Sequence, residues 1–165
     1  MGRKTWIDSD IWTDIRKHLD PVDERIYTRL LCNPNGNIAG YFLLDTMWLA
    51  GSVGISEDEL IARLKSQTKY WMFDENTSQV LIPTYTKYNT ISGSKQFAAL
   101  NKAIKPLSIC KLHLYLVCCL EKYSGIGTSK AIDANILREV LRASSRWKGK
   151  DTAEPIRLLK TILNE

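Results

Sequence analysis

The stretch from Asn33 to Tyr85 constrains the fold more than any other part of the chain, because its local signals follow one another in a defined order. The Asn and Gly residues around Pro34 predict a turn, since Pro keeps the preceding residue out of the helical region and Asn and Gly adopt turn conformations readily. The apolar run from Gly40 to Leu44 then predicts a short strand.

Two short helices are predicted directly after this strand. Asp45 is placed to cap a helix over residues 46–53, and Gly54 is placed to end it. Ser56 and Glu59 have the spacing of a capping box, which begins a second helix. Only a glycine-containing connection separates the two helices, and this is typical of a helix-turn-helix.

A β-hairpin is expected after the second helix, which covers residues 56–66. The β-favouring residues 70–73 and 80–82 flank the polar residues 74–78. Turn, strand, two helices and hairpin in this order indicate a winged helix-turn-helix, a unit that usually docks on nucleic acid or on a partner protein. The expected fold class is therefore mainly α with a small β-wing.

Further helices are predicted on both sides of this unit. Apolar residues at helical spacing indicate helical turns over residues 6–19, and Asp20 followed by Pro21 begins a helix that ends before Asn33. We divide the chain into a winged-helix domain at 1–90 and a basic helical extension at 91–165. Helices are expected in the extension over residues 95–105, 107–123, 133–141 and 153–163, with a loop at 125–128. The second of these is apolar through its middle, which predicts a buried spine or a dimer contact.

The net charge of +5 is divided unevenly along the chain. Residues 1–75 carry nine Lys or Arg and twelve Asp or Glu, which gives −3, whereas residues 76–165 carry fourteen and six, which gives +8. No acidic residue lies between Glu75 and Glu121. A stretch of one sign attracts polyanions, because its cations neutralise phosphates and release counterions. A solvated basic helix face is the competing explanation.

Candidate DNA contacts follow from the winged helix and this charge pattern. The second helix opens with Glu57, Asp58 and Glu59, and phosphates would repel these acids where a recognition helix normally offers its N-terminal residues. Because acids are stabilised at a helix N-terminus by the macrodipole, this helix start has a structural explanation. Contacts are therefore expected from the end of the helix, the wing tip and the basic stretch behind it. The candidates are Arg63, Lys65, Gln67, Lys69, Asn76, Thr77, Ser78, Lys87 and Lys95. For each of them, an ordinary solvated side chain is the competing interpretation.

Aromatic residues offer a second kind of contact, because nucleic-acid bases stack on them. Tyr85 and Tyr88 lie in a polar setting and are the better stacking candidates. The remaining aromatics of this region lie in apolar patterns and are expected in the core. They are Trp12, Tyr41, Trp48, Trp71 and Phe73.

The sequence offers no catalytic or metal-binding constellation. Four cysteines without a Cys-x-x-Cys pair and two histidines do not make the closely spaced ligands of a zinc site. No nucleophile elbow, Walker motif or complete dinucleotide fingerprint occurs. We therefore expect no enzyme activity, no metal and no cofactor. Reduced cysteines are expected in a cytoplasmic protein, and no apolar run reaches the ~18 residues of a membrane span.

Several short strings within about residues 6–90 resemble one protein family. They are Ile11-Trp12-Thr13-Asp14, Leu30-Leu31-Cys32-Asn33-Pro34, Ile38-Ala39-Gly40-Tyr41, Ile55-Ser56-Glu57 and Tyr85-Thr86-Lys87-Tyr88-Asn89. Together they are similar to the N-terminal domain of phage replication-initiation proteins, the replisome organisers related to the bacterial DnaD primosome protein. This resemblance implies DNA binding, self-association and recruitment of a replicative helicase or its loader at a replication origin.

Two hypotheses on function follow. The leading one is a DNA-binding protein that acts in the initiation of replication, of the phage or mobile-element type, through the winged helix and the basic C-terminal half. The alternative is a protein-interaction or dimerisation module, an assembly factor or transcriptional regulator without direct DNA contact, because an acidic second helix suits a protein partner.

Overall fold

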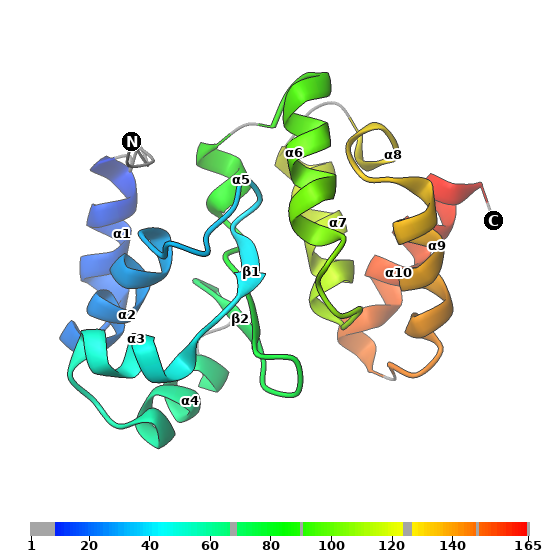
Figure 1. The fold of residues 1–165 in the computed structure, drawn as a ribbon. Coiled ribbons are helices and arrows are strands. Elements are labelled where there is room, and N and C mark those ends of the chain that lie inside the picture. The colour runs from blue at the N-terminus through cyan, green and yellow to red at the C-terminus, as the bar shows by residue number, and fades with distance from the viewer. Residues whose placement is uncertain (1–8, 67–68, 90, 124–126, 148, 165) are drawn as a thin grey trace.

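A computed structural model describes residues 9–66, 69–89, 91–123, 127–147 and 149–164 (Figure 1). The chain is mainly helical and has one small antiparallel sheet of three strands, in the order β1-β3-β2. The first half contains α1 (Ser9–His18), α2 (Pro21–Leu31), β1 (Tyr41–Leu43), α3 (Thr46–Val53), α4 (Glu57–Ser66), β2 (Met72–Asp74), β3 (Gln79–Leu81) and α5 (Tyr85–Tyr88). The second half contains α6 (Ser94–Ile104), α7 (Leu112–Tyr123), α8 (Thr128–Ala131), α9 (Ala134–Ser144) and α10 (Lys150–Leu163).

The helix starts of the first half form as the sequence predicts. The Asp20 carboxylate accepts hydrogen bonds from two backbone amides of the first turn of α2, both at 2.8 Å. Asp45 accepts from the amide of Trp48 at 2.9 Å and so caps α3. The Ser56 hydroxyl accepts from the amide of Glu59 at 3.2 Å, whereas the Glu59 carboxylate accepts from Arg63. The capping box is therefore observed only in its Ser-to-backbone half.

The sheet separates two hydrophobic cores, because side chains alternate between its faces. In β1 and β3, Phe42 and Val80 face the first core, while Tyr41 and Leu81 face the second. Both pairs are directly opposite each other in the antiparallel register. Figure 1 shows the sheet between the helices α1–α4 on one side and α6–α10 on the other. The second core therefore draws on residues from both sides of the predicted domain boundary at residue 90.

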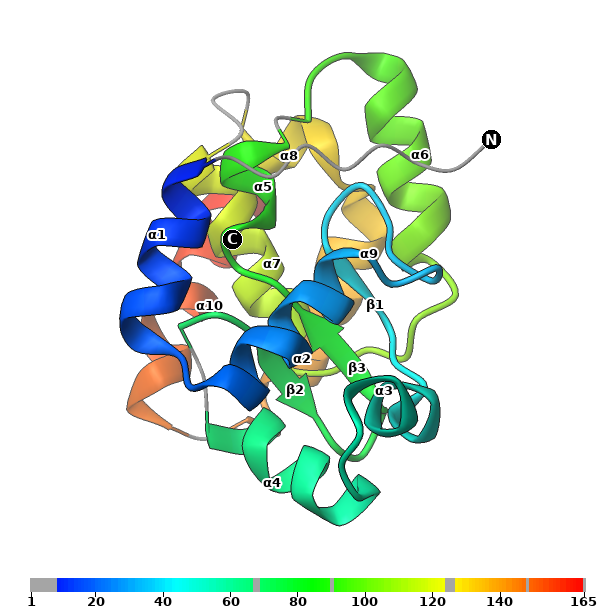
Figure 2. The same ribbon diagram turned by 90° about the vertical axis from the view of Figure 1, so that its left-hand side faces the viewer.

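The first core is built around Trp71, which is fully buried. Its indole nitrogen donates to the backbone oxygen of Leu64 at 3.1 Å, and its ring stacks with that of Tyr27 at 6.2 Å between centroids. Figure 2 looks onto this side of the molecule, where α2 crosses in front of the strands. The hydrogen bond ties the end of α4 to the chain that enters the hairpin, and it fixes the direction in which α4 leaves the core.

A buried polar cluster joins the sheet to α7. The Tyr41 hydroxyl contacts the side-chain oxygen of Gln79 and lies 2.8 Å from Nδ1 of His113. Gln79 in turn donates to the backbone oxygen of Ser108 at 2.8 Å, and the Cys110 amide donates to Nδ1 of His113 at 3.3 Å. The second ring nitrogen of His113 is buried and has no hydrogen-bond partner among the described residues. Burial lowers the pKa of His113 to about 4.

Several helix boundaries differ from the sequence prediction. The helix expected over 107–123 begins only at Leu112, because the backbone before it forms separate turns and supplies the Ser108 oxygen to Gln79. The last helix begins at Lys150 rather than at 153, since the Thr152 hydroxyl bonds back to the oxygens of Trp147 and Gly149. The short helices α5 and α8 were not predicted. Within the described ranges, no helix is both long and apolar enough to cross a membrane.

Acid should destabilise the fold through His113. Its pKa is about 4 in the folded chain, against 6.5 for an exposed histidine. The unfolded chain therefore binds the proton first, so the contribution of neutral His113 is fully present above pH 6.5 and is lost as the pH falls towards 4. That loss amounts to on the order of 3 kcal/mol. We expect the unfolding free energy of His113→Gln, measured by denaturant titration, to depend less on pH in this window. A pH dependence that is unchanged in His113→Gln would contradict this assignment.

Gly40 should not tolerate a side chain. Its φ is +63°, and an added Cβ would lie 2.5 Å from Cβ and Cγ of Tyr85. We expect Gly40→Ala to cost about 2 kcal/mol or more, because backbone strain and a steric overlap act together. Gly54→Ala is the matched control, since φ there is +81° but no atom lies within 4 Å of the added Cβ. It should cost about 1 kcal/mol. Equal losses in thermal unfolding would show that the contact with Tyr85 contributes nothing.

Candidate nucleic-acid interface

Arg63 is held by three carboxylates of the first half. Its guanidinium donates to Asp20 at 2.8 Å, to Asp23 at 3.1 Å and to Glu59 at 3.0 Å. The hydrogen bond with Asp20 contributes most to raising the pKa of Arg63, and the same contact lowers the pKa of the Asp20 carboxyl. These bonds lock α4 against the start of α2. They leave the guanidinium engaged inside the molecule rather than directed at a phosphate.

The other described cations at the end of α4 are paired as well. The Lys65 ammonium forms an ion pair with Glu75 of the hairpin. Lys69 lies 3.1 Å from the Asp14 carboxylate and 4.9 Å from the centre of the Tyr70 ring. This contact lowers the pKa of Asp14 and raises that of Lys69. Gln67 lies outside the described residues.

The tip of the hairpin is ordered by its own side chains. The Asp74 carboxylate accepts from the backbone amide and the hydroxyl of Thr77, both at 2.9 Å. Ser78 adopts a left-handed conformation with φ of 50°, and its backbone oxygen accepts from Leu44 at 2.8 Å. Of the three predicted wing-tip contacts, only Asn76 presents an exposed side chain without a described internal partner.

Lys87 lies on α5 and shares a groove with Lys69. This groove, of about 360 Å³, lies between α1, α2 and α5. Its two cations are balanced by two acids, Asp10 and Asp14. The Lys87 ammonium lies 5.0 Å from the centre of the Tyr88 ring, and the hydrogen bond to the Tyr88 hydroxyl raises the pKa of Lys87. The groove therefore has aromatic walls but no excess of positive charge.

Two expectations on the aromatic residues are wrong. Tyr85, predicted as a stacking platform, is buried in the first core, where it packs against Gly40. Trp48, predicted in the core, is 41% exposed because the other face of α3 turns inward. Tyr88 is half-buried and remains a candidate. Tyr41 and Trp71 are buried, and Trp12 and Phe73 pack partly buried against the first core, as expected.

One basic surface of the described chain lies along α6. Lys95 and Lys102 are exposed and, at seven residues apart, lie on one face of the helix; Lys105 follows at its C-terminal end. No carboxylate of the described residues forms an ion pair with any of the three. The first turn of α6 contains Lys95 and no acid, so a side-chain cation adds to the positive end of the helix dipole. Sequence analysis included only Lys95 among the candidates, although the absence of acids from residues 76–120 was the signal for all three.

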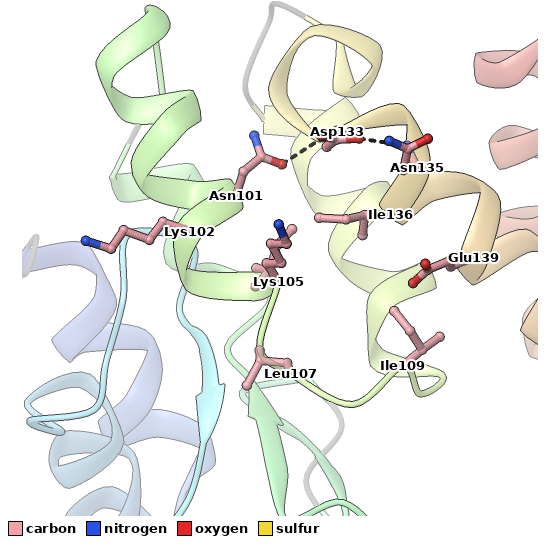
Figure 3. Close-up of a pocket in the computed structure, with 10 residues that line it drawn as sticks. Asn101, Lys102, Lys105, Leu107, Ile109, Asp133, Asn135, Ile136 and Glu139 are labelled. Carbon is pink, nitrogen blue, oxygen red and sulfur yellow. Dashed lines mark hydrogen bonds between the residues drawn. The ribbon is translucent and has the colours of Figure 1, made fainter.

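A groove separates α6 from α9 (Figure 3). Its volume is about 470 Å³, and its floor is apolar, formed by residues that include Ile104, Leu107 and Ile136. In Figure 3, Lys105 points from α6 towards α9, whereas the ammonium of Lys102 extends away from it. Asp133 and Glu139 line the opposite wall, so the groove itself has two acids beside its two lysines. Lys95 and Lys102 thus share one face of α6 and Lys105 follows at its end, an arrangement that suits an extended polyanion better than a small anion.

The described residues contain neither a disulfide nor a cluster of metal ligands. All four cysteines are free, and no group of three or more His, Cys, Asp or Glu residues could hold a metal ion within the ranges that the structure covers. Lys111, the remaining lysine of the acid-free stretch, is paired with Asp151. Comparison with protein-family models, with curated proteins and with solved structures finds no match for this chain.

Removal of Arg63 should affect stability and leave nucleic-acid binding intact. Arg63→Gln leaves the carboxylates of Asp20, Asp23 and Glu59 without their shared cation, and Asp23 is only 4% exposed. We expect a loss of roughly 1–3 kcal/mol in unfolding free energy. Lys65→Gln breaks one exposed pair and should cost under about 1 kcal/mol. A destabilised Lys65→Gln and an unaffected Arg63→Gln in urea titrations would contradict this assignment.

Proposed function

We propose that this chain binds DNA through the basic face of α6. The observation that carries the proposal is that Lys95, Lys102 and Lys105 are exposed on or next to one helix and make no ion pair with a described carboxylate. Free surface lysines release counterions when they meet phosphates, and this gain is lost for lysines already held by acids. Lys65 of α4 and Lys69 after it are held by acids in this way.

The spacing along α6 suits a phosphate backbone. Seven residues of helix rise about 10 Å, which matches roughly three steps of one DNA strand at ~3.4 Å each. Small side chains lie between these lysines, with Ala98 and Ala99 exposed on the same helix. A strand can therefore approach the helix closely. Contacts of this kind go to phosphates and carry no sequence information, so the proposed binding is tolerant of sequence.

In this proposal the winged helix is a scaffold for the DNA-binding surface. The order β1, α3, α4 and the hairpin β2-β3 is the order predicted for a winged helix-turn-helix, with β1 paired to the hairpin. We infer that this unit positions the DNA-binding surface and that its own second helix does not read bases. The first turn of α4 carries three acids, and its described cations are paired internally.

The resemblance to phage replisome organisers supports a role in the initiation of replication. On this proposal the chain acts in the cytoplasm, associates with further copies on DNA and brings a replicative helicase or its loader to the site. These partners are proposed because the short strings in residues 6–90 resemble that family.

The salt dependence of DNA binding tests the proposal. We expect log affinity for duplex DNA to fall linearly with log salt, and the variant Lys95→Gln/Lys102→Gln/Lys105→Gln to reduce that slope by about 2 to 3, because each lost phosphate contact lowers it by ~0.9. The variant Lys65→Gln/Lys69→Gln/Lys111→Gln has the same net charge but removes paired lysines. It should change the slope by less than about 1. A flat slope for the wild type, or equal losses in both variants, would overturn the proposal.

A further inference from the structure

Three large apolar side chains are exposed together at the junction of β1 and α3. Leu43 is 54% exposed, Met47 is 73% exposed and Trp48 is 41% exposed, and they are the exposed large hydrophobic residues of the described chain. They lie within six consecutive residues, so we call them the α3 patch. Large apolar groups gathered on a surface are unfavourable in water unless another molecule covers them.

The fold itself does not require these residues to be apolar. α3 buries Leu49, Ala50 and Val53 against the first core, and its capping needs only Asp45 and Gly54. A helix on the surface of a globular protein normally carries polar residues on its outer face. Met47 and Trp48 occupy that outer face, and Leu43 extends it onto β1, which is an edge strand. The patch is therefore best explained by contact with another molecule.

The chain segment that carries the patch is acidic. Between Arg29 and Arg63 the sequence contains no Lys or Arg and four acids, namely Asp45, Glu57, Asp58 and Glu59. Two of these acids are tied to the start of α3, since Asp45 caps the helix and Glu57 accepts from the Thr46 hydroxyl. The nearest cations in sequence are Arg29, which is exposed on α2, and Arg63, which is already paired. Acids therefore outnumber bases in the segment that carries the patch.

We propose that the α3 patch docks a segment of a partner protein in which large apolar side chains are flanked by Lys or Arg. Apolar side chains of the segment would cover Met47 and Trp48, while its cations would face Asp45, Glu57 and Asp58. DNA fits this patch poorly, because the acids beside it would repel phosphates. In both Figure 1 and Figure 2, α3 and α4 lie at the end of the molecule away from the start of α6, the helix turn that carries Lys95.

A second copy of this chain fits the patch poorly. Patch-to-patch pairing would bring two acidic rims together, and like charges in contact are destabilising. Pairing of the patch with the basic face of α6 would offer only small exposed side chains, Ala98 and Ala99, against Met47 and Trp48. Within the described ranges, no other surface carries large exposed hydrophobic residues. A partner with its own apolar side chains is therefore favoured over self-association.

The probe for this proposal is a labelled synthetic peptide of leucine and lysine at helical spacing, with a leucine–glutamate peptide of the same pattern as its counterpart. We expect the full chain to bind the lysine peptide and not the glutamate peptide in fluorescence anisotropy. Met47→Gln and Asp58→Asn should each weaken binding by about three- to tenfold. Glu139→Gln, which removes an exposed acid on α9, should leave the affinity unchanged.

Each contrary result has a definite meaning. No binding of the lysine peptide, or equal binding of the glutamate peptide, would overturn the proposal. An equal loss in Glu139→Gln would show attraction by net charge alone. Self-association in gel filtration that Met47→Gln abolishes would identify a second copy as the occupant and would also overturn it. DNA affinity should be unchanged in Met47→Gln, so a failure here is distinguishable from a failure of the α6 proposal.

Discussion

The alternation of side chains along β1 and β3 is the constraint on which the rest of the structure depends. Because Phe42 and Val80 face one way and Tyr41 and Leu81 the other, a sheet of three short strands supports a core on each side. A register shift by one residue would exchange the two sets and bring the Tyr41 hydroxyl into an apolar core. The contacts of Tyr41 with Gln79 and His113 hold the register, since they are satisfied in only one alignment.

The same architecture explains why cations of the first half are paired with acids, whereas those of α6 in the second half are not. In the first half, α2, α4 and the hairpin converge on one core, and their acids and bases meet at its edge, as Arg63 meets Asp20 and Asp23. In the second half, α6 lies at the border of its core with one face exposed, and the stretch around it contains no acid to pair with. The lysines on α6 are available for a ligand because the neighbouring sequence contains no acidic residue.

The local elements could be predicted from the sequence because their signals are local. Asp20, Asp45 and Ser56 cap helices through contacts with residues two or three positions away, and the hairpin follows from two β-favouring runs around a polar turn. Whether a candidate site residue forms an ion pair within the fold could not be predicted in the same way. Arg63 meets partners that are 40 and 43 residues away, so no local pattern records them.

The sequence also did not reveal which of the large side chains are exposed. Trp48 lies in an apolar pattern, which usually indicates burial. The inner face of a short helix, however, can hold only some of the apolar side chains of such a pattern. Leu49, Ala50 and Val53 fill that face, and Met47 and Trp48 are left outside. Tyr85 shows the opposite case, because Gly40 leaves space for its ring inside the core although its neighbours in sequence are polar.

On the two proposals, the acidic α4 and the basic α6 separate two tasks that one surface of a winged helix usually performs. In the usual arrangement the second helix enters the major groove, and its cations supply both affinity and register. Here the cations at the end of α4 stabilise the fold, its acids border an apolar surface, and the free lysines are carried by α6. Surfaces of opposite charge on separate elements do not compete for one ligand. On the two proposals, the chain holds a polyanion on α6 and a cationic protein segment on the α3 patch without competition between them.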